Sequence, residues 1–181
     1  PTAVIAYLVN TGNKLVLVDA GAAKLFGPTL GHVLENLKAS GYNPADVDAV
    51  LLTHLHGDHV GGLLTPDGQM AFPKATVYAA QADADFWLSA EAMAKAPEGA
   101  KGFFKMAQDS TAPYVKKGAW QTFSGSSEIL PGIHPVQESG HTPGHTGYLF
   151  ESKGQKLLIW GDVVHNAAVQ FPQPKVTIEF D

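Results

Sequence analysis

The sequence predicts a layered α/β fold in which two β-sheets meet at a shared rim, with helices outside them. Three observations lead to this fold class. Strand-like runs occupy both ends of the chain and helix-like runs lie between them. Residue types that bind metals follow strand-like runs in both halves. The 181 residues are 45% hydrophobic and contain no separating linker, so residues 1–181 are expected to form one domain.

The N-terminal third predicts a hairpin, a helix and a buried strand. Two β-prone runs at 4–9 and 15–18 flank an Asn/Gly-containing turn, which is typical of a β-hairpin. Residues 28–40 carry apolar residues at helical spacing, and Gly41 follows as a stop signal. His32 in this helix is expected at the surface. Residues 48–53 contain the apolar run Ala49-Val50-Leu51-Leu52 and predict a buried strand.

The remainder predicts one strand, two helices and four further strands. Residues 75–80 are β-prone, and the Ala-rich, acidic residues 81–93 favour a helix. A second helix is expected near 103–109, because loops are indicated by the Gly and Pro residues at 96–102 and by Ala112-Pro113. The final strands are expected at 120–123, 133–137, 148–151 and 156–160.

Bulk composition excludes several classes of function. The net charge is −5 and Lys and Arg are not clustered, so no nucleic-acid partner is expected. The chain has no cysteine, so any metal must be bound by His, Asp or Glu. No run of about 18 apolar residues occurs, so no membrane span is expected. The chain begins at Pro1 without methionine, which is typical of a processed or cut chain, so the compartment is left open.

One stretch dominates the chemistry. Residues 54–59 read His-Leu-His-Gly-Asp-His, directly after a predicted strand. His54 and His56 are two residues apart, so both imidazoles leave the same face of an extended strand. Asp58 and His59 follow where the strand gives way to a helix, so they can turn toward a second point nearby. This pattern favours two neighbouring divalent cations over one, and a solvated turn would not need three imidazoles.

Further ligand-type residues lie at other predicted strand ends. They are His145 in a loop that also holds His141, and Asp162 after the last strand. With these, six ligand-type groups exceed the four that a closed structural zinc site needs. No Gly-x-Ser-x-Gly motif and no cysteine is present to supply a nucleophile, so water between two metal ions is the expected nucleophile of a hydrolase. Asp19, before Ala20-Gly21, is by itself a turn residue.

These motifs resemble those of the metallo-β-lactamase-fold superfamily, whose signature His-x-His-x-Asp-His is matched by residues 54–59. The resemblance covers nearly the whole chain and implies an αββα sandwich. It implies that His54, His56 and His145 bind the first metal, that Asp58 and His59 bind the second, and that Asp162 bridges the two. Asp19 and His141 would then touch the ligands without binding metal themselves. Asp58 and Asp162 are the expected catalytic residues.

A closer resemblance is to the methyl parathion hydrolase group, with its lactonase-like and aryl-esterase-like relatives. It rests on residues 18–28, 83–89 and 167–171. Aromatic residues line the leaving-group pocket in that group, and the matching positions here are Phe26, Trp87 and Phe104. His165, where organophosphate specialists tend to have an apolar residue, is expected in the pocket and favours a lactone or carboxyl ester. An ordinary surface histidine is the alternative.

The chain departs from the group in one respect. The resemblance implies a further His ligand well downstream of the bridging Asp, but 19 residues follow Asp162 and His165 is the only His among them. The first strands and the C-terminal helices of the fold are also expected to be missing, which leaves sheet faces that favour a homodimer.

The expected function is hydrolysis of lactones, aryl esters or organophosphate triesters by hydroxide between two divalent ions. Zinc is the first expectation, with manganese, iron and cobalt as alternatives. The alternative reading is a truncated or partner-dependent fragment that binds metal and has little activity.

Overall fold

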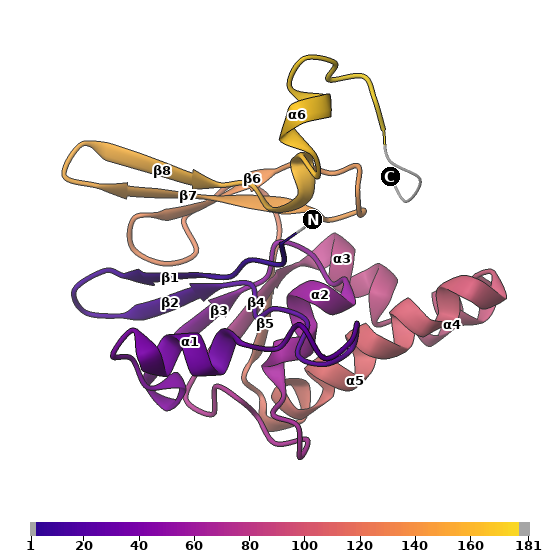
Figure 1. The fold of residues 1–181 in the computed structure, drawn as a ribbon, viewed down its shortest axis with the longest axis horizontal. Coiled ribbons are helices and arrows are strands. Elements are labelled where there is room, and N and C mark those ends of the chain that lie inside the picture. The colour runs from indigo at the N-terminus through magenta and orange to yellow at the C-terminus, as the bar shows by residue number, and fades with distance from the viewer. Residues whose placement is uncertain (1–2, 178–181) are drawn as a thin grey trace.

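The computed structural model describes residues 3–177 and contains two sheets that face each other (Figure 1). The first sheet has the order β1-β2-β3-β4-β5, with β1 antiparallel to β2 and the other pairs parallel. Its strands are β1 (Tyr7–Asn10), β2 (Leu15–Val18), β3 (Ala49–Leu51), β4 (Thr76–Ala80) and β5 (Trp120–Phe123). The second, antiparallel sheet contains β6 (Ile133–Gln137), β7 (Thr146–Ser152) and β8 (Gln155–Ile159).

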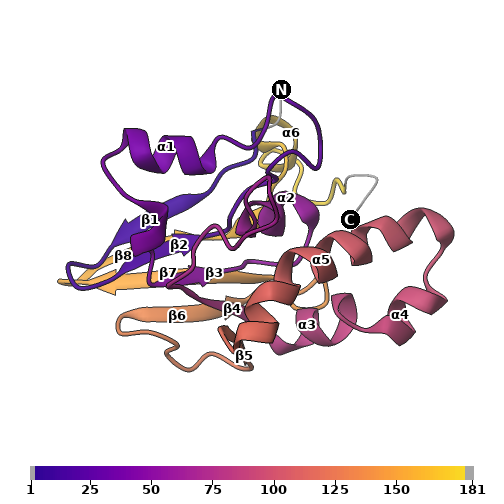
Figure 2. The same cartoon turned by 90° about the horizontal axis from the view of Figure 1, so that it is seen from below.

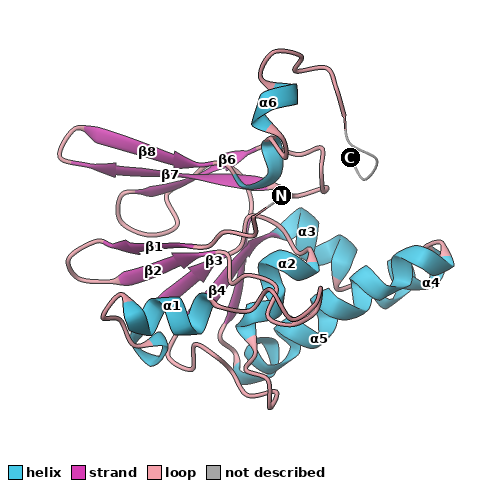
Figure 3. Ribbon diagram, in the orientation of Figure 1, coloured by secondary structure: helices cyan, strands magenta, loops and turns pink. Residues whose placement is uncertain are grey.

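Helices cover the side of the first sheet that faces away from the second sheet (Figures 1 and 3). They are α1 (Val33–Ala39), α2 (Gly57–Val60), α3 (Gln81–Trp87), α4 (Ala90–Lys95) and α5 (Lys101–Lys117). A last helix, α6 (Ala167–Gln170), stands beyond the end of β8. The predicted layered α/β class is therefore confirmed. No helix within residues 3–177 is long and apolar enough to cross a membrane.

Alternation along the central strands builds two cores. In β2, Val16 and Val18 point toward the second sheet and pack in one cluster with Ile133, Tyr148 and Phe150, whereas Leu17 packs with the helices. Successive strand residues point to opposite faces, so a strand buried on both sides is apolar throughout. This explains why the β2 and β3 runs lack polar positions.

The topology brings distant chain segments to one edge. The segments after β2 and β3, the loop before β7 and the segment after β8 meet at the same end of the two sheets (Figure 1). The buried Tyr148 hydroxyl on β7 donates a hydrogen bond of 2.7 Å to the Leu52 carbonyl after β3. The two sheets are thus tied together next to the sequence that carries the histidine motif.

Three predicted helices differ from the observed ones. The helix expected at 28–40 begins only at Val33, because Gly31 adopts a left-handed φ of +91° that breaks the helical path. The helix expected at 81–93 is two helices, since the Ser89 side chain accepts the Ala92 N–H and caps α4.

The expected loop at Ala112-Pro113 is instead the interior of α5. Residues Phe104, Ala107, Thr111 and Tyr114 are buried along one face of this helix. Their burial outweighs the one backbone hydrogen bond that Pro113 cannot make. The helix ends at Gly118, whose φ of +75° is left-handed.

The outer face of the second sheet is open in the described part of the chain. Leu158 on β8, which pairs with Leu149 on the side away from the buried Tyr148 and Phe150, is 42% exposed. Figure 2, which views the molecule from below, shows the two sheets stacked with the helices α3 to α5 on the near side.

Candidate metal centre

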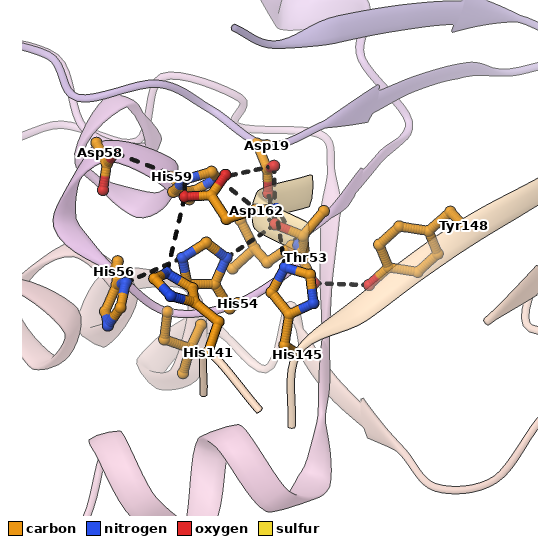
Figure 4. Close-up of polar contacts among 12 residues, drawn as sticks. Asp19, Thr53, His54, His56, Asp58, His59, His141, His145, Tyr148 and Asp162 are labelled. Atoms are coloured by element: carbon orange, nitrogen blue, oxygen red, sulfur yellow. Dashed lines mark hydrogen bonds and ion pairs between the residues drawn. The ribbon is translucent and has the colours of Figure 1, made fainter. Parts of the chain in front are cut away.

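The histidine motif lies where the strand ends of both sheets meet (Figure 4). His54 and His56 follow β3, and Asp58 and His59 lie in α2, which begins at Gly57. This is the strand-to-helix change that the sequence predicts. His59 stays close to His54, with ring centroids 4.0 Å apart, so the end of the motif lies beside its beginning.

His54, His56 and His141 form the first group of candidate ligands. Their nitrogens lie within 4.8 Å of one another, and His54 Nε2 is 3.0 Å from His56 Nδ1. Burial, with neighbouring imidazoles adding to it, holds the pKa of His54 well below its usual value and lowers the pKa of His56 to about 3. Neutral imidazoles offer lone pairs, so this donor set fits zinc or a related first-row divalent ion.

The second group is built on a carboxylate. Asp162 Oδ2 lies 3.3 Å from His59 Nε2, and Asp58 Oδ2 lies 3.6 Å from the same nitrogen. Burial opposes a charge on His59, but the carboxylates of Asp19, Asp162 and Asp58 outweigh it and hold its pKa well above the usual value. Burial likewise opposes a charge on Asp162, yet His59 lowers the pKa of Asp162 to about 2. This cluster of carboxylates favours a positive charge, which a divalent cation also supplies.

Asp19 contacts His59 of this second group through the ring nitrogen that faces away from Asp162. Its carboxylate accepts the Thr53 N–H at 2.8 Å and contacts His59 Nδ1 at 2.9 Å. Asp19 adopts a left-handed φ of 59°, which Asp tolerates better than most residues. A proton on Nδ1 directed at Asp19 leaves Nε2 of His59 facing the site, as carboxylates behind metal-binding histidines commonly do. Asp19 thus contacts a candidate ligand, as the family resemblance implies, and is not only a turn residue.

His141 and His145 have different surroundings in the structure. Nε2 of His145, a fully buried side chain, accepts the Asp162 backbone N–H at 3.0 Å. Its other ring nitrogen lies 3.9 Å from Glu138 Oε2, on the side away from the site. Among residues 3–177, the three groups of clustered ligand atoms include His141 twice and omit His145. His141 thus lies among the clustered ligand atoms, whereas His145 holds the backbone of Asp162. The expectation that His145 binds the first metal stays a prediction.

An aromatic pocket of about 520 Å³ opens directly over these side chains. Its wall includes Phe26, Trp87 and Phe103 together with His56, Asp58, His141, Asp162 and His165. His165 Nε2 lies 3.3 Å from Asp162 Oδ2, and the side chain is only 18% exposed. His165 is therefore a pocket residue and not an ordinary surface histidine.

Phe104 was expected in this wall but lies behind it. It is 2% exposed and packs against Trp87 with ring centroids 4.7 Å apart, whereas its neighbour Phe103 lines the pocket. The buried face of α5 passes through Phe104 and Tyr114 at helical spacing, which places Phe103 off that face. Helical periodicity in the sequence could have separated the two residues.

A comparison with protein families identifies the superfamily. The family model described as the metallo-beta-lactamase superfamily matches residues 1–174. The chain belongs to this superfamily.

Solved and curated members of the superfamily are similar over most of the chain. The hydrolase AbOPH has a TM-score of 0.91 and 44% identity, covering 97% of this chain and 61% of its own. AidC, a dizinc quorum-quenching lactonase solved with the product N-hexanoyl-L-homoserine, has a TM-score of 0.81 and 26% identity, covering 92% of this chain and 58% of its own. An N-acyl homoserine lactonase of Bacillus sp is 27% identical over 166 residues, 81% of this chain and 58% of the relative. The chain thus spans about three fifths of the length of these superfamily members.

Proposed function

We propose that this protein is a metal-dependent hydrolase that opens lactones at a centre of two divalent ions. The observation that carries the proposal is the shared wall of the pocket, in which candidate metal ligands and aromatic rings face the same space. Relatives named as lactonases support the substrate class. The proposal extends to a two-ion centre because the clustered ligand atoms form three overlapping groups and not one, and Asp58 Oδ2 lies 3.6 Å from His59 Nε2 beside them. The groups are His54, His56 and His141; His54, His59 and Asp162; and His141, Asp162 and His165.

His54, His56 and His141 would bind the first ion, and Asp58, His59 and Asp162 would bind the second, with zinc proposed before manganese, iron or cobalt. When bound, such ions activate water at neutral pH and polarise the carbonyl that water attacks. His145 holds the backbone of Asp162, which keeps its carboxylate between the two groups.

The remaining pocket residues would orient the substrate and move protons. Asp58 lines the pocket with a 34% exposed side chain, so its carboxylate can accept the proton that the attacking water loses and pass it to the alkoxide that leaves when the ring opens. His165 can donate a hydrogen bond to the substrate carbonyl or ring oxygen. Phe26, Trp87 and Phe103 would receive the apolar part of the substrate.

The same aromatic wall favours a second substrate class, the aryl esters and aryl organophosphate triesters. A flat aromatic leaving group stacks on aromatic side chains better than an aliphatic one does. The presence of His165 beside Asp162 argues for the carboxyl substrates first, since an imidazole in the pocket suits a polar acyl group.

The test combines metal counting with three substrates. The 181-residue protein is loaded with zinc, freed of excess metal and assayed with N-hexanoyl-homoserine lactone, dihydrocoumarin and methyl parathion. We expect about two ions per chain and faster turnover of the two lactones, with none after chelation. Two bound ions without turnover of any substrate would overturn the substrate class. One bound ion and no turnover would favour the alternative of a partner-dependent metal-binding fragment.

A further inference from the structure

The two chain segments that carry the first ligand group are joined by one buried side chain, Asp83. It lies in the first turn of α3 and is 0% exposed. It is not among the clustered candidate ligands of residues 3–177, and it does not line the pocket. The pocket and ligand groups therefore do not explain why a carboxylate is buried here, a placement that is unfavourable unless the group is well bonded.

Both carboxylate oxygens of Asp83 accept backbone hydrogen bonds. Oδ2 accepts the Leu55 N–H at 2.9 Å, and Oδ1 accepts the Gly144 N–H at 2.7 Å. Leu55 lies between His54 and His56 in sequence, and Gly144 lies in the loop that contains His141. The two partners are 28 and 61 residues from Asp83 and belong to segments that leave different sheets.

Close packing fixes the loop against the helix at the same point. A Cβ atom on Gly144 would lie 2.5 Å from the Asp83 nitrogen and 3.0 Å from its Cβ atom. Only glycine therefore allows the loop to approach α3 closely enough for the hydrogen bond to form. The carboxylate and the glycine act together, one supplying the acceptor and the other the space.

We propose that Asp83 is a positioning residue that sets the spacing between His141 and the pair His54 and His56. This inference rests on the proposed metal-binding function, because it assigns Asp83 to the geometry of the first ion's ligands. Asp83 acts through the backbone of the two loops and touches no ligand side chain in these hydrogen bonds. Residues that orient metal ligands typically change metal affinity about 10–100-fold when they are replaced.

The decisive variant is Asp83→Asn. The amide keeps the size of the side chain but has one acceptor and one donor group, so in either orientation its NH₂ group faces a backbone N–H. The matched control is Asp85→Asn on the same helix, where the exposed carboxylate accepts a hydrogen bond from the Gln81 side chain. The probe is Co²⁺, whose affinity is measured by chelator competition and whose visible spectrum reports ligand geometry.

We expect Asp83→Asn to weaken the first Co²⁺ equivalent about 10–100-fold and to change its spectrum, with Asp85→Asn matching the wild type. Asp83→Glu keeps two acceptor oxygens and should bind Co²⁺ more tightly than Asp83→Asn. Unchanged affinity and spectrum in Asp83→Asn, with only a lower Tm of the metal-free protein, would reduce Asp83 to a structural role and overturn the proposal.

A measurement on the wild type covers the case in which the variants do not fold. The amide protons of Leu55 and Gly144 should exchange slowly with solvent in the metal-free protein, and fast exchange at both would overturn the proposal. If the wild type binds no Co²⁺, the proposed function fails. If the wild type binds Co²⁺ and Asp83→Asn binds it equally well, only the role of Asp83 fails.

Discussion

Replacing His141 and His145 separately by alanine should separate metal binding from folding. Nitrogens of His141 lie with those of His54 and His56, whereas His145 Nε2 is occupied by the Asp162 N–H. His141→Ala should therefore weaken the first metal ion, and His145→Ala should mainly lower the free energy of unfolding of the metal-free protein.

The two magnitudes follow from what each imidazole contacts. Four-ligand zinc sites are worth roughly 10–16 kcal/mol, or about 3 kcal/mol for each ligand, so His141→Ala should cost about a hundredfold in affinity. His145 is 0% exposed, so its loss leaves a cavity and removes the acceptor of a partly buried N–H. Together these effects should cost roughly 3 kcal/mol of unfolding free energy.

Two assays on the wild type and the two variants separate the effect on metal affinity from the effect on stability. Urea unfolding of the metal-free wild type and both variants gives the free energies, and Co²⁺ competition gives the affinities. His145 is fully buried and accepts the Asp162 N–H, whereas His141 is only partly buried, so the removal of His141 should cost less stability than the removal of His145. The reasoning is refuted if His145→Ala loses more affinity than His141→Ala while keeping wild-type stability.

Three further outcomes are expected. Gly62→Ala should lower the free energy of unfolding by roughly 3 kcal/mol or more, because the new Cβ would lie 1.9 Å from the Ala20 carbonyl oxygen and must displace backbone. Urea unfolding that shows a loss below about 0.5 kcal/mol, the size expected for an exposed site, would contradict this. Phe104→Ala should lower the free energy of unfolding by about 3–5 kcal/mol. Phe103→Ala, at the 36% exposed neighbour, should leave the free energy of unfolding nearly unchanged and raise KM for aromatic substrates. An equal loss of stability in both variants would contradict the placement of Phe104 in the core and Phe103 in the pocket wall. The hydrogen bond from Lys74, with a second from the Leu15 N–H, holds the pKa of Asp48 below its usual 3.8. The ionised Asp48 carboxylate therefore stabilises the fold above about pH 4, and this stabilisation is lost as the pH falls through the folded-state pKa of Asp48. Urea unfolding should therefore show that the difference in unfolding free energy between wild type and Asp48→Asn shrinks as the pH falls below about 4. A difference that grows on acidification would contradict the lowered pKa of Asp48.

Several strands of both sheets could be predicted from local pattern. The hairpin of β1 and β2 and the strands β5 and β6 lie where β-prone runs between turn residues indicate them. Helix boundaries were harder to predict because they depend on packing. Pro113 indicates a loop by itself, but it lies inside α5 because neighbouring side chains on that helix are buried against the sheet.

By itself, the sequence determined the chemistry of the histidine motif, because strand and helix geometry dictate locally where His54, His56, Asp58 and His59 point. Only the tertiary structure distinguishes the surroundings of His141 from those of His145. Both lie in one polar loop, four residues apart, and no local periodicity orients a loop. Its orientation follows from contacts distant in sequence, the Gly144 N–H with Asp83 and the His145 ring with the Asp162 N–H. Those contacts exist only once both sheets have packed together.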